Sequence, residues 1–386
     1  MNKDSTTQNE LPQTAAPVDV QAQFSGTQPV AERHAFDEAA LLDWMRGRID
    51  GIGEEMQVEQ FKGGQSNPTF RLSTGGRAFV LRRKPPGVLL PSAHAVEREY
   101  RVIRALSGTE VPVARAHALC EDASVIGSPF YIMDNVDGRI FWDPTLPGQN
   151  RAERAAIFDE MNRVIAALHS IDPVQIGLAD YGKPGNYMER QVARWTRQYR
   201  AAETEPIEAA DRLIDWLPRH LPASDDDPSR SRIVHGDYRL DNVIFHPTQL
   251  RIIAVLDWEL STLGDPLADF AYHCMTWRMS GEGSRGLAGV DLGALGIPSE
   301  ADYLQRYLQR VRQASHELDG RLGDSISDAT WAYYMVFNMF RLVGILQGVA
   351  ARAQQGNASN SRARDAGRRA RPLAEQAWAL AQQIAS

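Results

Sequence analysis

The chain has 386 residues, of which 43% are hydrophobic and 24% are charged, and its formal net charge is −7. This composition is typical of a folded globular protein, and the length favours two compact units or one two-lobed unit. The acidic balance argues against a nucleic-acid partner, and the lack of an uncharged apolar run of about 18 residues argues against a membrane span. Two distant cysteines and a polar start without a secretory signal predict a cytoplasmic protein.

The first part of the chain is predicted to be a tail followed by strands. Residues 1–33 are rich in Gln, Thr, Pro and Ala and predict a disordered tail, and helical spacing begins near Asp37. Alternating or apolar stretches bounded by turn residues predict strands at 56–61, 70–73, 78–83 and 129–133, with a helix at 93–106. Beyond residue 134 the pattern is mostly helical, with short strands at 243–245 and 252–256.

These elements predict an α+β fold with two lobes. Residues 34–134 would form a small N-terminal lobe around an antiparallel sheet, and residues 135–386 a larger, mainly helical lobe. Ligands favour the cleft between such lobes. We therefore expect a nucleotide-binding N-terminal lobe and a C-terminal lobe for catalysis and substrate binding.

The most informative segment is 235–242, with the sequence HGDYRLDN. It fits H-x-D-x-x-x-x-N, the spacing of the catalytic loop in kinase-type phosphoryl transfer. That reaction needs a carboxylate to orient the attacking hydroxyl and hard oxygen ligands for Mg²⁺. Asp237 and Asn242 can supply both, and Asp257, directly after an apolar stretch, can complete the metal shell. Each residue taken singly is equally well explained as a turn cap or a strand end, but the ordered set favours phosphoryl transfer.

Together with the segment 264–269, GDPLAD, these residues resemble the aminoglycoside phosphotransferase/choline kinase-like family. Its members are small-molecule kinases with the two-lobed protein-kinase-like fold, and the likeness extends over about residues 35–350. The stretch 80–94 is similar to the kinase module fused to some acyl-CoA dehydrogenases. The resemblance implies ATP or GTP as co-substrate, Mg²⁺ as cofactor and a small-molecule hydroxyl as acceptor.

Residue by residue, the resemblance implies the following roles in the helical lobe. Asp237 is similar to the catalytic base, and Asn242 and Asp257 are similar to the Mg²⁺ ligands. Arg239 falls where many protein kinases place a lysine that touches the transferring phosphate. Asp269 resembles the buried acid that accepts hydrogen bonds from the catalytic-loop backbone, with a helix N-cap as the alternative.

On the nucleotide side, Arg82 stands where the family usually has a lysine on the third strand. Arginine still offers a fixed charge and a bidentate fork for phosphate oxygens. Arg83 and Lys84 are alternatives, although strand alternation points them away if Arg82 faces the cleft. Glu99 resembles the acidic partner of this basic residue, and Glu97 is the alternative.

Two further segments are assigned to the nucleotide. Gly63, Gly64 and Ser66 lie between two predicted strands, where a glycine-rich loop would cover the phosphates. The third glycine of G-x-G-x-x-G is missing, so an ordinary hairpin turn explains the segment as well. Residues 133–136 resemble the hinge that holds the purine ring, with Asn135 and Val136 as its contacts.

The sequence therefore predicts a kinase that transfers a γ-phosphoryl group to a substrate hydroxyl, with a hydroxyacyl-CoA or related acyl compound as the favoured acceptor. The alternatives are an aminoglycoside or choline-like phosphotransferase and a catalytically silent nucleotide-binding module. We expect the loop 181–186 and the helix beginning near Met188 to form the acceptor walls, because their aromatic and basic groups suit such a substrate. The arginines between 362 and 371 are expected to form a solvated helix face. No oligomeric state is indicated.

Overall fold

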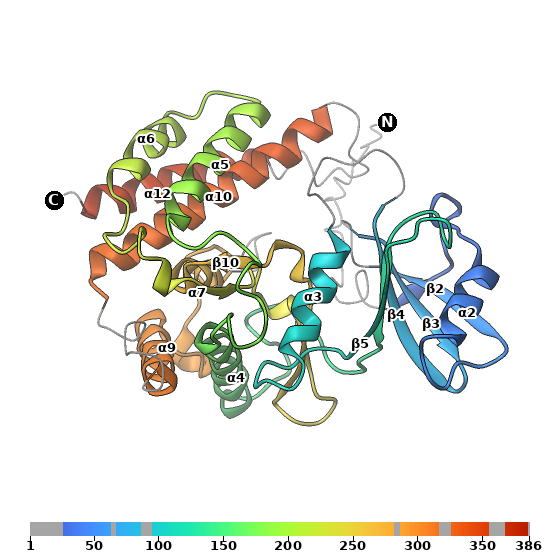
Figure 1. Cartoon of the computed structure of the whole chain (residues 1–386). Helices are drawn as coiled ribbons and strands as arrows, with labels where there is room; N and C mark the ends of the chain where they lie inside the picture. Colours follow the sequence, from blue (N-terminus) through green and yellow to red (C-terminus); the bar gives the residue numbers. More distant parts are fainter. Residues whose placement is uncertain are drawn as a thin grey trace, which may run out of the picture.

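The structure, a computed structural model, describes residues 26–62, 67–85, 95–281, 286–315, 326–354 and 367–384. Figure 1 shows two lobes, a small sheet-containing lobe and a larger helical lobe, as the sequence predicts. Helix α3 lies between the sheet and the helical lobe in this view. The α+β, protein-kinase-like fold class is confirmed.

The N-terminal lobe is built on one antiparallel sheet of six strands in the order β1-β2-β3-β4-β6-β5. Its strands are β1 (Thr27–Gln28), β2 (Met56–Phe61), β3 (Thr69–Thr74), β4 (Arg77–Arg83), β5 (Ala116–Cys120) and β6 (Phe130–Asp134). Its helices are η1 (Glu32–His34), α2 (Glu38–Arg46) and α3 (Val96–Leu106). Helix α2 begins where the Asp37 carboxylate caps the Ala40 N–H.

Strand β1 corrects the predicted extent of the N-terminal tail. Thr27 and Gln28 pair with Phe61 and Gln60, which places this strand at the edge of the sheet. The carbonyl of His34 also accepts a hydrogen bond from Arg83. Residues 26–33 are therefore part of the fold, because non-local strand pairing overrides a composition poor in large apolar groups. The rest of the predicted tail, residues 1–25, lies outside the described residues.

The two faces of the sheet pack against different partners. On one face, apolar side chains of β3, β4 and β6 form a small core with α2. On the other face, Tyr131 of β6 joins a core that includes Val102 and Ile103 of α3 and continues into the C-terminal lobe. This alternation follows from the two-residue period of a strand. It turns alternate side chains of β4 and β6 toward the cleft.

The C-terminal lobe consists of helices around two short hairpins. The helices are α4 (Arg151–Ser170), α5 (Tyr187–Ala202), α6 (Glu208–Trp216), α7 (Pro266–Cys274), α8 (Leu292–Leu295), α9 (Glu300–Ser315), α10 (Asp328–Gln354) and α12 (Ala370–Ile384). Short 3-10 helices are η2 (Leu217–Arg219), η3 (Pro228–Arg230), η4 (Leu240–Asn242), η5 (Trp258–Leu260) and η6 (Met275–Trp277). The hairpins pair β7 (Arg232–Val234) with β10 (Thr262–Gly264) and β8 (Val243–Phe245) with β9 (Ile252–Val255).

Helix α10 is the central helix of this lobe. By length and composition alone it could cross a membrane, but 72% of its most apolar window is buried inside the protein. It packs against α5, α7 and α12, and Figure 1 shows it among these helices. Its apolar surface is therefore used in the core of the lobe.

Candidate active site

The catalytic-loop segment 235–242 connects β7 to β8, and its backbone is hydrogen-bonded to a buried acid. Asp269, on α7, accepts hydrogen bonds from the N–H groups of His235 (2.7 Å) and Gly236 (2.8 Å). Burial opposes its ionisation, but the hydrogen bond and charge of His169 keep the pKa of Asp269 below its usual value. Asp265, and not Asp269, caps α7. The structure therefore gives Asp269 the contacts implied by the resemblance.

His235 and Gly236 fix the path of the loop. The His235 imidazole contacts the Leu256 carbonyl through Nε2 (2.8 Å) and accepts from the Asp237 N–H through Nδ1 (3.1 Å). Gly236 has φ of 83°, and a Cβ there would lie 2.9 Å from the Leu260 carbonyl oxygen. Only glycine fits this left-handed, crowded position.

Asp237, Arg239 and Asn242 lie together, as predicted. Asp237 Oδ2 accepts a hydrogen bond from Asn242 Nδ2 (2.9 Å), and the same amide nitrogen donates to the Asp237 carbonyl (2.8 Å). Arg239 Nε lies 3.5 Å from Asp237 Oδ1, and Arg239 Nη2 donates to Asp241 (3.1 Å). Asp237 Oδ1 also accepts from the Tyr272 hydroxyl (2.8 Å), a partner that is absent from the predicted site residues.

Asn242 and Asp257 lie next to each other at the ends of two paired strands. Asn242 precedes β8, Asp257 follows β9, and the Leu256 N–H donates to the Asn242 carbonyl (2.8 Å). The Asn242 Nδ2 is used by Asp237, which leaves Oδ1 without a hydrogen bond within the described part of the chain. Asp257 follows β9 in a left-handed conformation (φ 64°), which is uncommon for a residue other than glycine and is found at functional sites. Its side chain is 34% exposed.

These two side chains fit a magnesium ion. Both offer hard oxygen donors, and Mg²⁺ is usually held by one or two protein groups together with nucleotide phosphates. Across the residues that the structure describes, no group of three or more His, Cys, Asp or Glu side chains is placed to hold a metal. A metal at this position would therefore need further oxygen ligands from nucleotide phosphates or water.

Arg82 is the centre of a buried ionic cluster between the two lobes. Its Nε lies 2.8 Å from Glu99 Oε2, and its Nη2 lies 2.6 Å from Asp257 Oδ1 and 3.5 Å from Glu259 Oε2. Burial disfavours the charge, but Glu99 and the other carboxylates raise the pKa of Arg82 above its usual value. The guanidinium therefore links the sheet and α3 to the proposed metal ligand Asp257.

The structure distinguishes Arg82 and Glu99 from their alternatives. Arg83 points to the opposite face of the sheet, where it stacks on Phe36 and donates to the His34 carbonyl (3.0 Å). Lys84 pairs with Glu97 (2.9 Å) away from this cluster. Glu99 instead is buried and accepts hydrogen bonds from Asn67 (2.8 Å) and Tyr131 (3.2 Å).

The structure describes the predicted hinge but not the predicted glycine-rich segment. The Asn135 N–H donates to the Ala78 carbonyl (3.3 Å) and so continues the pairing of β6 with β4. The Val136 N–H has no hydrogen bond within the described ranges. Gly63, Gly64 and Ser66 lie outside the described residues.

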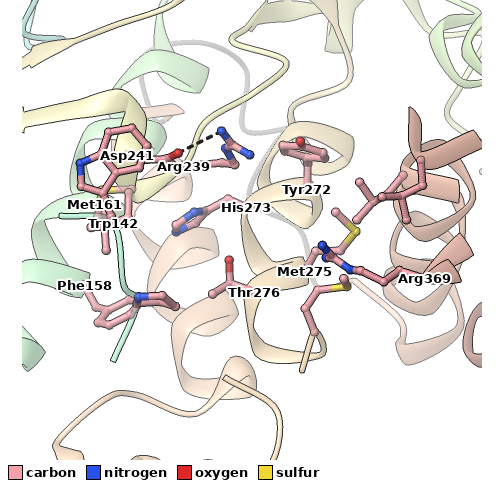
Figure 2. Close-up of a pocket in the computed structure, with 15 residues that line it drawn as sticks. Trp142, Phe158, Met161, Arg239, Asp241, Tyr272, His273, Met275, Thr276 and Arg369 are labelled. Atoms are coloured by element: carbon pink, nitrogen blue, oxygen red, sulfur yellow. Dashed lines mark hydrogen bonds and ion pairs between the residues drawn. The ribbon is translucent and has the colours of Figure 1, made fainter. Parts of the chain in front are cut away.

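A cavity of about 350 Å³ lies beside the catalytic loop. Most of its wall is apolar, and it is lined by Trp142, Pro144, Phe158, Met161, Arg239, Leu240, Asp241, Tyr272, His273, Met275, Thr276, Met279, Leu342, Leu346 and Arg369. Figure 2 shows the Arg239–Asp241 ion pair at one side of this cavity and Arg369 across from Trp142 and Met161. Tyr272 touches both Asp237 and the cavity, so the cavity borders the catalytic loop.

The predicted acceptor walls, the loop 181–186 and the helix beginning near Met188, do not line this cavity. Tyr181 is buried and its hydroxyl is 2.6 Å from Ser261 Oγ, while Arg190 donates to the carbonyls of Lys183 and Gly185. These contacts hold part of the segment within the fold, and its role in binding the acceptor stays a prediction. The expectation that the C-terminal arginines are only solvated is also wrong for Arg369, which lines the cavity.

The sequence matches the model of the phosphotransferase enzyme family over residues 57–318. The chain belongs to this family. It is a phosphotransferase with a hydroxyl group as acceptor, and its fold and site geometry agree with that membership.

The phosphotransferase is similar over most of its length to two individual proteins. It is 44% identical over 358 residues to acyl-CoA dehydrogenase family member 10 of Mus musculus, a match that covers 92% of this chain and 32% of that protein. The chain spans between about a third and a half of the length of the curated relatives it matches. A solved structure from Ralstonia eutropha, whose name assigns it provisionally to the aminoglycoside phosphotransferases, has 55% identity and a TM-score of 0.80, and the match covers 90% of this chain and 99% of that one.

A more distant structure shares the fold alone. It is a thermostable mutant of an aminoglycoside phosphotransferase, in a ternary complex with AMP-PNP and hygromycin B. It is 16% identical to this chain, with a TM-score of 0.54, and the match covers 88% of this chain and 98% of that one.

Sequence reasoning missed the cavity wall and Tyr272. One signal was present for Tyr272, because it follows Asp269 by three residues on a helix and so lies on nearly the same face. Since Asp269 faces the catalytic loop, its neighbour one turn later was a candidate contact. Nothing comparable marks Trp142 or Arg369, which are far from the loop in the sequence.

Proposed function

We propose that this phosphotransferase transfers the γ-phosphoryl group of ATP or GTP, bound with Mg²⁺, to the hydroxyl of an apolar, acyl-type acceptor such as a hydroxyacyl-CoA. The observation that carries the proposal is the cavity of about 350 Å³ next to Asp237, with apolar walls and two arginines. The likeness to a protein named as an acyl-CoA dehydrogenase family member also supports an acyl compound.

In this proposal Asp237 is the catalytic base. Its carboxylate would accept the proton of the acceptor hydroxyl as the new bond to phosphorus forms, and it would orient that hydroxyl beforehand. Arg239, 3.5 Å from Asp237, always carries its charge and would face the transferring phosphate. The side chain of Asp237 is 19% exposed, so it can be reached from the cleft.

Asn242 and Asp257 would hold the magnesium ion through their side-chain oxygens. When bound, the ion neutralises charge on the nucleotide phosphates. Arg82, oriented by Glu99, would contact the phosphates as well, and the Val136 N–H would bind the purine. Gly63, Gly64 and Ser66 are proposed to cover the phosphates.

The charges of the cavity favour one acceptor class over the others. Among its described lining residues the only carboxylate is Asp241, which is paired with Arg239. Burial lowers the pKa of His273, also in the wall, to about 4, so this imidazole is neutral near pH 7. A polycationic aminoglycoside or a choline ammonium would thus meet arginines without free carboxylates, whereas an acyl chain gains from the apolar wall. An anionic group on the acceptor would suit Arg369.

A panel of acceptors tests the proposal. Consumption of ATP and of GTP with Mg²⁺ is measured with medium-chain hydroxy acids, their CoA thioesters, kanamycin and choline. We expect turnover with the hydroxyacyl compounds and little with the two cations. Efficient turnover of kanamycin or choline, without turnover of any acyl compound, would show that the proposed acceptor class is wrong.

A further inference from the structure

Both carboxylate oxygens of Asp237 are held by side chains of the protein. Oδ2 accepts from Asn242 Nδ2 (2.9 Å), and Oδ1 accepts from the hydroxyl of Tyr272 (2.8 Å), which comes from α7 rather than from the catalytic loop. A carboxylate with a donor on each oxygen cannot rotate about its Cβ–Cγ bond without losing a hydrogen bond. Tyr272 therefore contributes to the orientation of the group that would face the acceptor.

Tyr272 is itself held in place. Its side chain is only 7% exposed, and the guanidinium of Arg341, on α10, lies 4.4 Å from the centre of its ring. Arg341 also donates a hydrogen bond to the carbonyl of Gly236 (2.6 Å), the residue directly before Asp237. Phenol, guanidinium and loop backbone thus form one connected set of contacts around Asp237.

The Tyr272 hydroxyl is a permanent donor in this arrangement. Burial, followed by the negative charge of Asp237, raises the pKa of the phenol above its usual value. The O–H bond is therefore intact throughout the pH range in which an enzyme works. Proton transfer from the acceptor remains the task of Asp237, and the phenol fixes its position.

We propose that Tyr272 is a positioning residue, whose hydroxyl holds the Asp237 carboxylate in the orientation that meets the acceptor hydroxyl in the adjoining cavity. The proposal rests on the proposed role of Asp237 as the base, and it does not depend on which acceptor is phosphorylated. A group that is fixed before the reaction needs no reorganisation in the transition state, so the effect belongs to turnover rather than to nucleotide binding.

Replacing Tyr272 by phenylalanine tests the proposal, because Y272F keeps the ring, the Arg341 contact and the cavity wall and removes only the hydroxyl. Turnover is measured with the best acceptor of the panel, and also as slow hydrolysis of MgATP without any acceptor. We expect kcat to fall about 10- to 100-fold in both assays, the size expected for a lost hydrogen bond to a charged group. The KM for MgATP and the melting midpoint should stay close to those of the wild type.

Tyr334→Phe is the matched control. Tyr334 is also buried, and its hydroxyl donates to Asp265 (2.5 Å), so Y334F removes the same atom from a tyrosine–aspartate pair outside the catalytic loop. We expect Y334F to lower the melting midpoint and to leave kcat within about twofold of the wild type. A crystal structure of Y272F should show the Asp237 carboxylate rotated away from the position that it has here, a readout independent of activity.

The possible failures can be told apart. A Y272F enzyme with wild-type kcat, alongside an inactive Asp237→Asn enzyme, overturns the positioning role and leaves the base in place. Equal losses in Y272F and Y334F, or a loss that follows the melting midpoint, make Tyr272 merely structural and also overturn the proposal. An active Asp237→Asn enzyme removes the base itself, and with it the reason to position it.

Discussion

The nucleotide side of the candidate active site and the cavity beside it differ in how their charged side chains are arranged. On the nucleotide side, Arg82 is surrounded by the carboxylates of Glu99, Asp257 and Glu259, so positive and negative groups alternate over a few ångströms. On the proposed acceptor side, a mostly apolar cavity is lined by Arg369 and by Arg239, which is paired with Asp241. The first arrangement suits a metal and a polyphosphate, and the second suits an acceptor without positive charge. The comparison suggests that variants on the two sides will fail in different steps.

The largest expected effect concerns Asp237, which lies between the nucleotide side and the cavity. Its replacement should lower turnover without lowering nucleotide affinity. Asp237→Asn keeps the size of the side chain but removes the base, so we expect turnover to fall about 10²- to 10⁴-fold. Nucleotide affinity, measured by calorimetry, should change little, because the loss concerns the transition state. Turnover within a few fold of the wild type would sink the assignment.

His273, in the wall of the cavity, should make the stability of the fold depend on pH in the acid range. His273 is buried, and its pKa is lowered to about 4, so the unfolded chain gains this proton first as the pH falls. The contribution to stability is complete above about pH 6.5 and is lost as the pH falls from there to about 4, by roughly 3 kcal/mol. Urea unfolding of His273→Gln should show a flatter pH dependence over this interval. The exposed His220→Gln should not, and if its curve flattens equally, His273 is not the cause.

On the nucleotide side, Asp257→Ala should act on metal-dependent binding. The variant removes a proposed Mg²⁺ ligand and one partner of Arg82, so we expect Mg²⁺-dependent affinity for ATP to fall by at least about 10- to 100-fold, a loss seen even for outer partners of metal sites. Titrations with and without Mg²⁺ measure it. Identical metal titration curves for variant and wild type would make Asp257 only a strand end.

The smallest expected effect probes the apolar wall alone. Met279→Glu adds a carboxylate to the cavity, and Met279→Leu preserves its character. We expect the KM for a hydroxyacyl acceptor to rise about tenfold in M279E and to stay near the wild-type value in M279L. The KM for ATP should be the same in both, and a matching change there would mean that the two sides are not separate.

The nucleotide side and the loop could be predicted because their determinants are local. Asp237, Asn242 and Asp257 fall within one short stretch of sequence, and the two-residue period of β4 sends Arg82 toward the cleft and Arg83 to the other face. The two-lobed fold followed from strand and helix patterns and from the family resemblance.

The acceptor side could not be predicted in this way. Its wall combines Trp142, Phe158, Leu342 and Arg369, which meet only when the helices pack, and none of them belongs to a motif. An aromatic residue in a helix resembles any other core residue, so the only sequence signal for Tyr272 was its spacing of three residues from Asp269. The composition of the loop 181–186 does not reveal that Tyr181 is buried, with its hydroxyl bonded to Ser261.

The proposed acceptor class is tested most directly in a competition assay. The enzyme is incubated with ATP, Mg²⁺ and an equimolar mixture of a medium-chain hydroxyacyl-CoA, kanamycin and choline. Phosphorus NMR and mass spectrometry then identify the compound that carries the new phosphate ester. We expect the ester on the hydroxyl of the acyl chain, because the cavity beside Asp237 is mostly apolar and has no unpaired carboxylate among its described lining residues. A phosphate ester found only on kanamycin or choline would contradict it.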